Sequence, residues 1–155
     1  MALILNAYAR LGVPSPVLFD YFAQEATRKI KHFDLQSICV LVSAYSKTNS
    51  PSGKLFDAAG ERVGFLADQL YPRAIAMLVH AFANKGERHG LLLYHVPELV
   101  ARHADQYNLD ELGMLCHAYG SLQLANTILF DAVIDQLPKR EEQLRLHPVQ
   151  PSSSS

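Results

Sequence analysis

The chain has 155 residues, of which 49% are hydrophobic and 19% charged, and its formal net charge at pH 7 is -1. This length and apolar content suffice for one well-buried globular unit. The near-neutral charge excludes the strongly basic class of nucleic-acid-binding protein, and no apolar run reaches the ~18 residues of a membrane span. The two cysteines, Cys39 and Cys116, are predicted to be buried free thiols, not disulfide partners or zinc ligands.

A seven-residue phrase recurs along the chain at one interval. NAYARLG begins at Asn6, SAYSKTN at Ser43, HAFANKG at His80 and HAYGSLQ at His117, so that each start lies 37 residues after the previous one. A fixed period of this length is typical of a stacked array of similar units, in which each unit buries its apolar face against the next.

Each unit is predicted to hold two helices, which we call helix A and helix B. Apolar residues at Ile38, Leu41, Val42 and Tyr45 have helical spacing, and the later half of each unit shows the same periodicity. The ranges predicted for helix A are 35–48, 72–85 and 109–122, and those for helix B are 16–32, 53–69, 90–105 and 127–145.

Local start signals accompany these helices. Ser15 followed by Pro16 has the order of an N-cap and a proline at the first helical position. Asn108 and Glu111 have the spacing of a capping box. Pro97 lies within a predicted helix B, where we expect it to kink or delay the helix.

Two adjacent positions of helix A are predicted to form the contact between repeats. A small residue allows helices of neighbouring repeats to approach closely, and the aromatic residue after it fills the groove between them. The predicted buried alanines are Ala7, Ala44, Ala81 and Ala118, and the aromatic residues are Tyr8, Tyr45, Phe82 and Tyr119.

The fold class that follows is all-α: an α-solenoid of about four 37-residue helix–turn–helix repeats. The array is predicted to span residues 1–146, with repeats at about 1–33, 34–70, 71–107 and 108–146. Residues 147–155 are rich in Pro and Ser and are predicted to be a disordered tail or linker. Met1 aligns with Ile38, inside a repeat, so we expect the chain to be a piece of a longer protein, or a protein whose presequence has been lost.

A polar stripe is predicted along helix A, opposite its apolar face. Gln36, Ser43 and Lys47 follow the spacing i, i+7, i+11 and therefore share one side of the helix. Their equivalents in the other repeats are neutral polar, basic or His, with Asp110 as the one acid. The candidate binding residues are Asn6, Arg10, Gln36, Ser43, Lys47, Arg73, His80, Asn84, His117 and Ser121.

The same stripe is also compatible with a helix face that is simply solvated. Any exposed helix face is polar, and Asp110 suits the first turn of a helix because of the helix dipole. His80 and His117 occupy equivalent positions about 8–10 Å apart, too far to share one metal ion. We find no nucleophile–base pair, phosphate-binding loop or metal-ligand spacing, and we expect no catalytic residue, no cofactor and no small-molecule substrate.

The period and the phrases resemble those of the heptatricopeptide repeats, which are related to the pentatricopeptide and octotricopeptide repeats and to proteins with a RAP domain. The resemblance rests on the AY phrase of helix A and on LFD at 18–20, 55–57 and 129–131, and it covers residues 1 to about 146. The repeat with LLY at 92–94 and Pro97 departs from the pattern, and no RAP domain is present in these residues. The resemblance implies a mitochondrial RNA-binding helical-repeat protein.

Two functions follow as expectations. The first is binding of single-stranded or fragmented ribosomal RNA, as a subunit or assembly factor of a mitochondrial ribosome, beside neighbouring proteins in a large ribonucleoprotein. Arg10, Lys47 and Arg73 would contact phosphates, while the neutral stripe residues would meet bases or riboses. The alternative is a protein–protein scaffold within a large mitochondrial complex, which the low net charge favours.

Overall fold

The computed structural model describes residues 7, 10, 11 and 15–146, and in this part of the chain every regular element is a helix. The prediction of an all-α protein is therefore confirmed for these residues, whereas the predicted tail at 147–155 lies outside them. The α-helices are α2 (Pro16–Lys29), α3 (Leu35–Ser46), α4 (Gly53–Phe65), α5 (Pro72–Lys85), α6 (Gly90–Arg102), α7 (Leu109–Ser121) and α8 (Thr127–Leu146).

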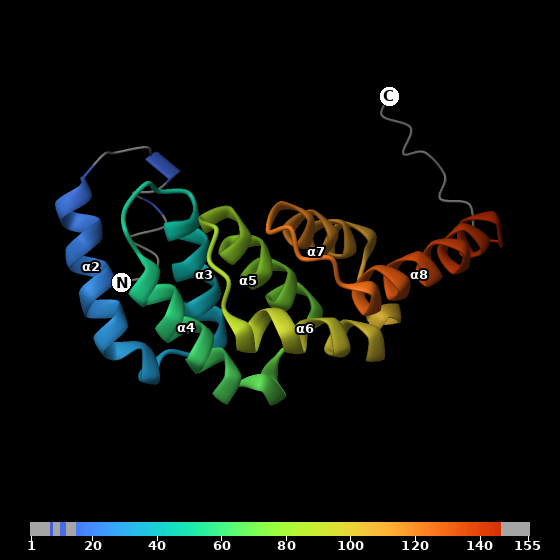
Figure 1. The fold of residues 1–155 in the computed structure, drawn as a ribbon, viewed down its shortest axis with the longest axis horizontal. Helices are drawn as coiled ribbons and strands as arrows, with labels where there is room; N and C mark the ends of the chain where they lie inside the picture. Colours follow the sequence, from blue (N-terminus) through green and yellow to red (C-terminus); the bar gives the residue numbers. More distant parts are fainter. Residues whose placement is uncertain (1–6, 8–9, 12–14, 147–155) are drawn as a thin grey trace, which may run out of the picture.

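The helices pack in two rows (Figure 1). The predicted A helices form one row, in which α5 packs between α3 and α7. The predicted B helices form the other, in which α2 contacts α4, α4 contacts α6 and α6 contacts α8. Consecutive helices α3–α4, α5–α6 and α7–α8 also touch, so the apolar core lies between the rows.

The α-helices of the structure begin at the residues that were predicted. Three of the B helices end earlier than predicted. After α2, α4 and α6 the chain forms short 3-10 helices at Ile30–His32, Ala67–Gln69 and Ala104–Gln106. A 3-10 turn tightens the end of an α-helix, and apolar periodicity does not distinguish it from one more α-helical turn. Pro97 does not delay its helix, since α6 begins at Gly90 and continues to Arg102; the expected delay is wrong, and the expected kink stays a prediction.

Three of the helix starts are closed by side chains, those of α3, α7 and α8; before α8, Oδ1 of Asn126 accepts the backbone N–H of Leu129 at 3.0 Å. The carboxylate of Asp34 accepts the backbone N–H of Ser37 at 2.8 Å. The capping box at Asn108 and Glu111 is confirmed, because each side chain accepts the backbone N–H of the other residue. Ser15 precedes α2 as predicted, but its side chain makes no capping hydrogen bond.

The small position of helix A is buried in three of the four repeats. Ala44, Ala81 and Ala118 are each 0% exposed, which confirms the predicted close contact between neighbouring A helices. Ala7 is exposed, so the prediction is wrong at this position, and its side chain lacks the cover that buries the other three alanines.

The aromatic position of helix A binds the helix B that precedes it. The Tyr45 hydroxyl donates to the Phe19 carbonyl at 2.6 Å, and the Tyr119 hydroxyl donates to the Leu93 carbonyl at 2.7 Å. Both pairs are 26 residues apart in sequence, so the two repeats use the same contact. Burial raises the pKa of both hydroxyls, because the ionised form would lose its hydration.

The intervening repeat replaces this hydrogen bond by an aromatic contact. Phe82 packs edge-on against Phe56, which lies the same distance before it in the sequence, with ring centroids 4.9 Å apart. The predicted role of this position in filling the groove is thus confirmed for three repeats, while Tyr8 lies outside the described residues.

The two cysteines are free thiols, as predicted, but only Cys39 is buried. Burial raises the pKa of the Cys39 thiol to about 11. Cys116 is half-exposed, so its predicted burial is wrong: the side of α7 that carries it has no further described helix packed on it. None of the described helices is long and apolar enough to cross a membrane.

Candidate nucleic-acid interface

Eight of the ten predicted stripe residues lie on the three A helices α3, α5 and α7 or at their ends. Exposed members are Gln36, Lys47, Arg73, Asn84, His117 and Ser121, whereas Ser43 and His80 are half-buried. Arg10 is exposed, and Asn6 lies outside the described residues.

His80 stands at the centre of the stripe, on the middle helix of the row. Its pKa is lowered first by partial burial and then by electrostatic repulsion from His117, on α7, and Lys47, at the end of α3. Both residues act on His80 because the contacts of α5 with α3 and α7 bring the three helices side by side. The imidazole is therefore held in its neutral form at a lower pH than a free histidine.

A hydrogen bond along α5 fixes the ring of His80. The Nδ2 atom of Asn84, one turn later, lies 3.2 Å from Nε2 of His80, a geometry in which the amide donates to the neutral ring. The Nδ1 atom of His80 is buried and has no hydrogen-bond partner. Uncharged imidazole and amide groups at a surface suit hydrogen bonding to a base or a ribose better than binding to a phosphate.

The row of A helices carries few carboxylates. The segments of α3 and α5 contain no acidic residue, and the acids of α7 are Asp110 and Glu111 in its first turn. Glu111 is buried in the capping box, which leaves Asp110 as the exposed one. Lys47 and Arg73 form no ion pair within the described residues. Their charges are therefore available to an anionic ligand.

A polar groove of about 590 Å³ continues the stripe at the C-terminal ends of α3 and α5. Lys47 and Asn84 line it together with the connection from Thr48 to Gly53 and with Lys85 and Glu87. The stripe prediction omitted this connection because it followed helical spacing alone. The polar run SKTNS after α3 was the signal that could have extended the candidate site.

Lys85 in this groove has a structural role. Its Nζ atom donates to the carbonyls of Thr48 and Ser50 at 2.7 and 2.8 Å and so holds the connection after α3. Partial burial lowers the pKa of this ammonium group. Two of its three donor hydrogens are occupied, which makes Lys47 the better phosphate ligand of the two lysines.

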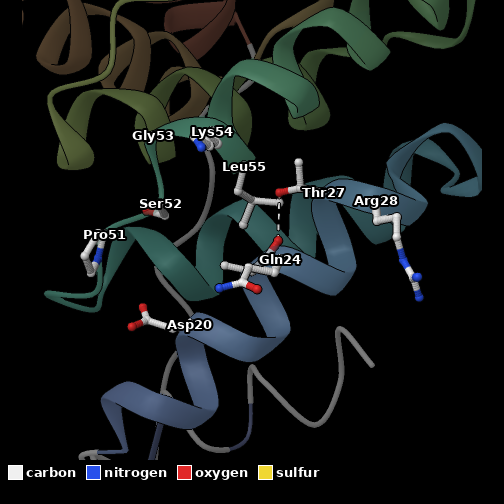
Figure 2. A pocket seen from close by; sticks show the side chains of 10 residues that line it. Asp20, Gln24, Thr27, Arg28, Pro51, Ser52, Gly53, Lys54 and Leu55 are labelled. Carbon is white, nitrogen blue, oxygen red and sulfur yellow. Dashed lines mark hydrogen bonds between the residues drawn. The ribbon is translucent and has the colours of Figure 1, made fainter.

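A second hollow, of about 570 Å³, lies in the other row between α2 and the start of α4 (Figure 2). Asp20, Gln24 and Ser52 line it, and the Ser52 hydroxyl is buried without a partner. Arg28 points away from the other labelled side chains and pairs with Glu25 at 2.9 Å. Asp20 places an exposed carboxylate in this hollow, and Arg28 and Lys54 line it too, so charge alone does not separate it from the groove on the A helices, which contains Glu87. The stripe is the stronger candidate because its residues run over three adjacent helices.

Neither metal chemistry nor comparison with known proteins adds to this candidate site. The described residues contain no group of three His, Cys, Asp or Glu side chains that could hold a metal ion. No protein-family model matches the sequence, and no curated protein matches it. The resemblance to the heptatricopeptide repeats therefore rests on the period and phrases of the chain itself.

Proposed function

We propose that this chain is a non-catalytic RNA-binding α-solenoid of about four repeats, with the row of A helices as its binding face. The observation that carries the proposal is the series Lys47, His80 and His117, which occupies neighbouring positions on three adjacent helices. The recurring contacts of the small and aromatic positions support the solenoid, because each hairpin uses the same surface toward the next.

The chemistry of the stripe favours unpaired RNA. Lys47 and Arg73 supply exposed positive charge for phosphates, while His80, Asn84 and His117 offer side-chain nitrogen and oxygen atoms for hydrogen bonds. The bases of a duplex are hidden in a deep A-form groove that side chains do not enter, so a shallow helical face suits splayed single strands. With the heptatricopeptide resemblance, this supports a role in the mitochondrion, as a ribosomal subunit or assembly factor.

The test is photocrosslinking of a single-stranded RNA to the full chain, followed by mapping of the crosslinked peptides. We expect attachment to peptides of α3, α5, α7 and the 48–53 connection, and competition by single-stranded rather than duplex RNA. Attachment confined to the B helices, or none at all, would contradict the proposal.

A second candidate function is a protein scaffold in a large mitochondrial complex. The row of B helices favours it, because Val17, Phe65 and Tyr94 are 81%, 83% and 74% exposed there. Large apolar side chains at a surface are typical of contacts with other proteins. Crosslinking to RNA separates the two functions, since a pure scaffold would yield no RNA-linked peptide from the A helices.

A further inference from the structure

The last hairpin, α7–α8, leaves uncovered the surface that the earlier hairpins use to bind their successors. In the row of A helices, Cys39 and Ala76 are 3% and 0% exposed, whereas Gly113, at the equivalent position of α7, is exposed. A side chain added at Gly113 would have no neighbour within 4 Å. The position three residues later repeats this pattern. Val42 and Val79 are 0% exposed there, but Cys116 is half-exposed.

The row of B helices shows the same change from buried to exposed. Val63 of α4 and Val100 of α6 are 3% and 0% exposed, and Leu137, at the equivalent position of α8, is 51% exposed. Pro97 is buried, and its equivalent Ile134 is 59% exposed. The end of the described array therefore presents exposed residues on both helices at positions that are buried in the earlier hairpins, which we call the tail face: Gly113, Cys116, Ile134 and Leu137.

The opposite end carries the complementary surface. A B helix meets its predecessor through residues such as Leu92, His95 and Val96 of α6, which line the hollow between α4 and α6. Their equivalents on α2 are Leu18, Tyr21 and Phe22, which we call the head face.

The head face is less covered than its counterparts. Leu92 and Val96 are 3% and 1% exposed, whereas Leu18 and Phe22 are half-buried. Tyr21 is 60% exposed, and its counterpart His95 is exposed as well, so Tyr21 marks the open edge of the face. Ala7, in the A-helix phrase before α2, is exposed although its equivalents are fully buried. In the described structure, neither the head face nor the tail face is covered by a neighbouring helix. Each face is of the kind that covers the other between the hairpins within the chain.

We infer that a second copy of this chain docks head to tail, with the head face of one copy against the tail face of the other. The contact would continue the α4–α6 and α6–α8 contacts already present within the chain, with apolar residues at the equivalent positions of the B helices. The two contacting surfaces differ, so the association is heterologous and forms chains or rings of copies, not closed two-fold dimers. It does not depend on RNA binding.

Sedimentation velocity of the full 155-residue chain over a concentration series tests this inference. The wild type should form species larger than a dimer as its concentration rises. Tyr21→Glu blocks the head face and Leu137→Glu blocks the tail face, so each variant alone should stay monomeric. Both side chains are more than half exposed, and the helical circular dichroism of the variants should therefore match the wild type.

Mixing the two variants gives the discriminating result. The intact head of Leu137→Glu should bind the intact tail of Tyr21→Glu, so the mixture should form a dimer and nothing larger. The control is Phe65→Glu, an exposed apolar residue outside both faces, which should associate like the wild type. A monomeric wild type, a Tyr21→Glu variant that dimerises alone, or a mixture that stays monomeric would overturn the inference. In the last two cases a two-fold contact or a different partner would cover these faces.

Discussion

Single side-chain contacts join the repeats, and one of them compensates for a proline. In an α-helix the Leu93 carbonyl would accept the N–H of the fourth residue after it, but that residue is Pro97, which has none. The Tyr119 hydroxyl donates to this carbonyl at 2.7 Å and fills the vacant place. The helix can therefore continue through Pro97 without an unsatisfied buried acceptor.

This arrangement predicts unequal costs for the same substitution at two equivalent tyrosines. Tyr119→Phe leaves the Leu93 carbonyl without a partner and should lower the free energy of unfolding by about 1–3 kcal/mol. Tyr45→Phe removes a bond to Phe19, whose carbonyl keeps the N–H of Ala23, and should cost about 0.5–1.5 kcal/mol. Urea unfolding of the two variants measures the difference, and a larger loss for Tyr45→Phe would contradict this account of Pro97.

His80 predicts an acid-dependent loss of stability. Its pKa in the folded chain lies below the ordinary value of 6.5, so the unfolded chain binds the proton more readily. The free energy of unfolding should fall as the pH drops below 6.5, until the folded-state pKa is passed. His80→Ser, which installs the residue of the equivalent position on α3, should flatten this slope, whereas His32→Ser, at an exposed site of the other row, should keep it. Equal slopes for all three proteins would show that His80 is not the cause.

At the scale of the helices, close packing between hairpins overrides intrinsic helix propensity. Gly60 of α4 is buried against His89, and a methyl group added there would lie 2.6 Å from the ring. Gly113 of α7 is also helical, but a methyl group there would meet nothing within 4 Å. The same residue type thus has opposite roles in two helices.

Replacement of these glycines by alanine should therefore change stability in opposite directions. Gly60→Ala should destabilise the fold by about 1–3 kcal/mol, because a well-packed site is overfilled. Gly113→Ala should stabilise it by up to about 1 kcal/mol, because alanine is the better helix former. Thermal unfolding at low protein concentration measures both, and a stabilised Gly60→Ala variant would mean that the contact between α4 and His89 yields easily.

The helices were predicted well because their signals are local and repeated. Apolar periodicity and the fixed interval placed the start of every described helix, and the box at Asn108 and Glu111 was predicted from spacing. The exposure of Ala7 and Cys116 was missed, because sequence equivalence assumes a neighbour on each side and cannot show which ends are uncovered. The stripe could be predicted as a helix face, but the groove beyond Lys47 depends on how the 48–53 connection folds against α5.

At the scale of the whole molecule, the contact between neighbouring A helices is completely buried. The stability of the fold should therefore depend strongly on the size of the side chain at this contact. Ala81 is 0% exposed on the middle helix α5, between α3 and α7. Ala81→Leu should overfill this contact and lower the free energy of unfolding by about 1–3 kcal/mol. Ala101→Leu, at an exposed site of α6, is the control and should change stability little. A neutral Ala81→Leu variant would mean that the row of A helices is loosely packed.

The charges also divide between the two rows. Lys47 and Arg73 on the A helices are free of ion pairs in the described structure, whereas Lys29 and Arg102 on the B helices lie 3.5 and 4.0 Å from glutamates. The near-neutral total of the chain therefore conceals an uneven distribution, and the proposed function depends on that unevenness.

The most direct test of a binding face on the A helices is to measure single-stranded RNA binding across a salt series. Two matched double variants, each with two charge reversals, are compared with the wild type. We expect the pair Lys47→Glu and Arg73→Glu to weaken binding strongly and to flatten the dependence of log K on log salt, by about 0.7 for each lost phosphate contact. The pair Lys29→Glu and Arg102→Glu changes the net charge equally and should leave both affinity and slope close to the wild type. Equal losses from the two pairs would contradict a binding face on the A helices, and no loss from either would contradict RNA binding through these charges.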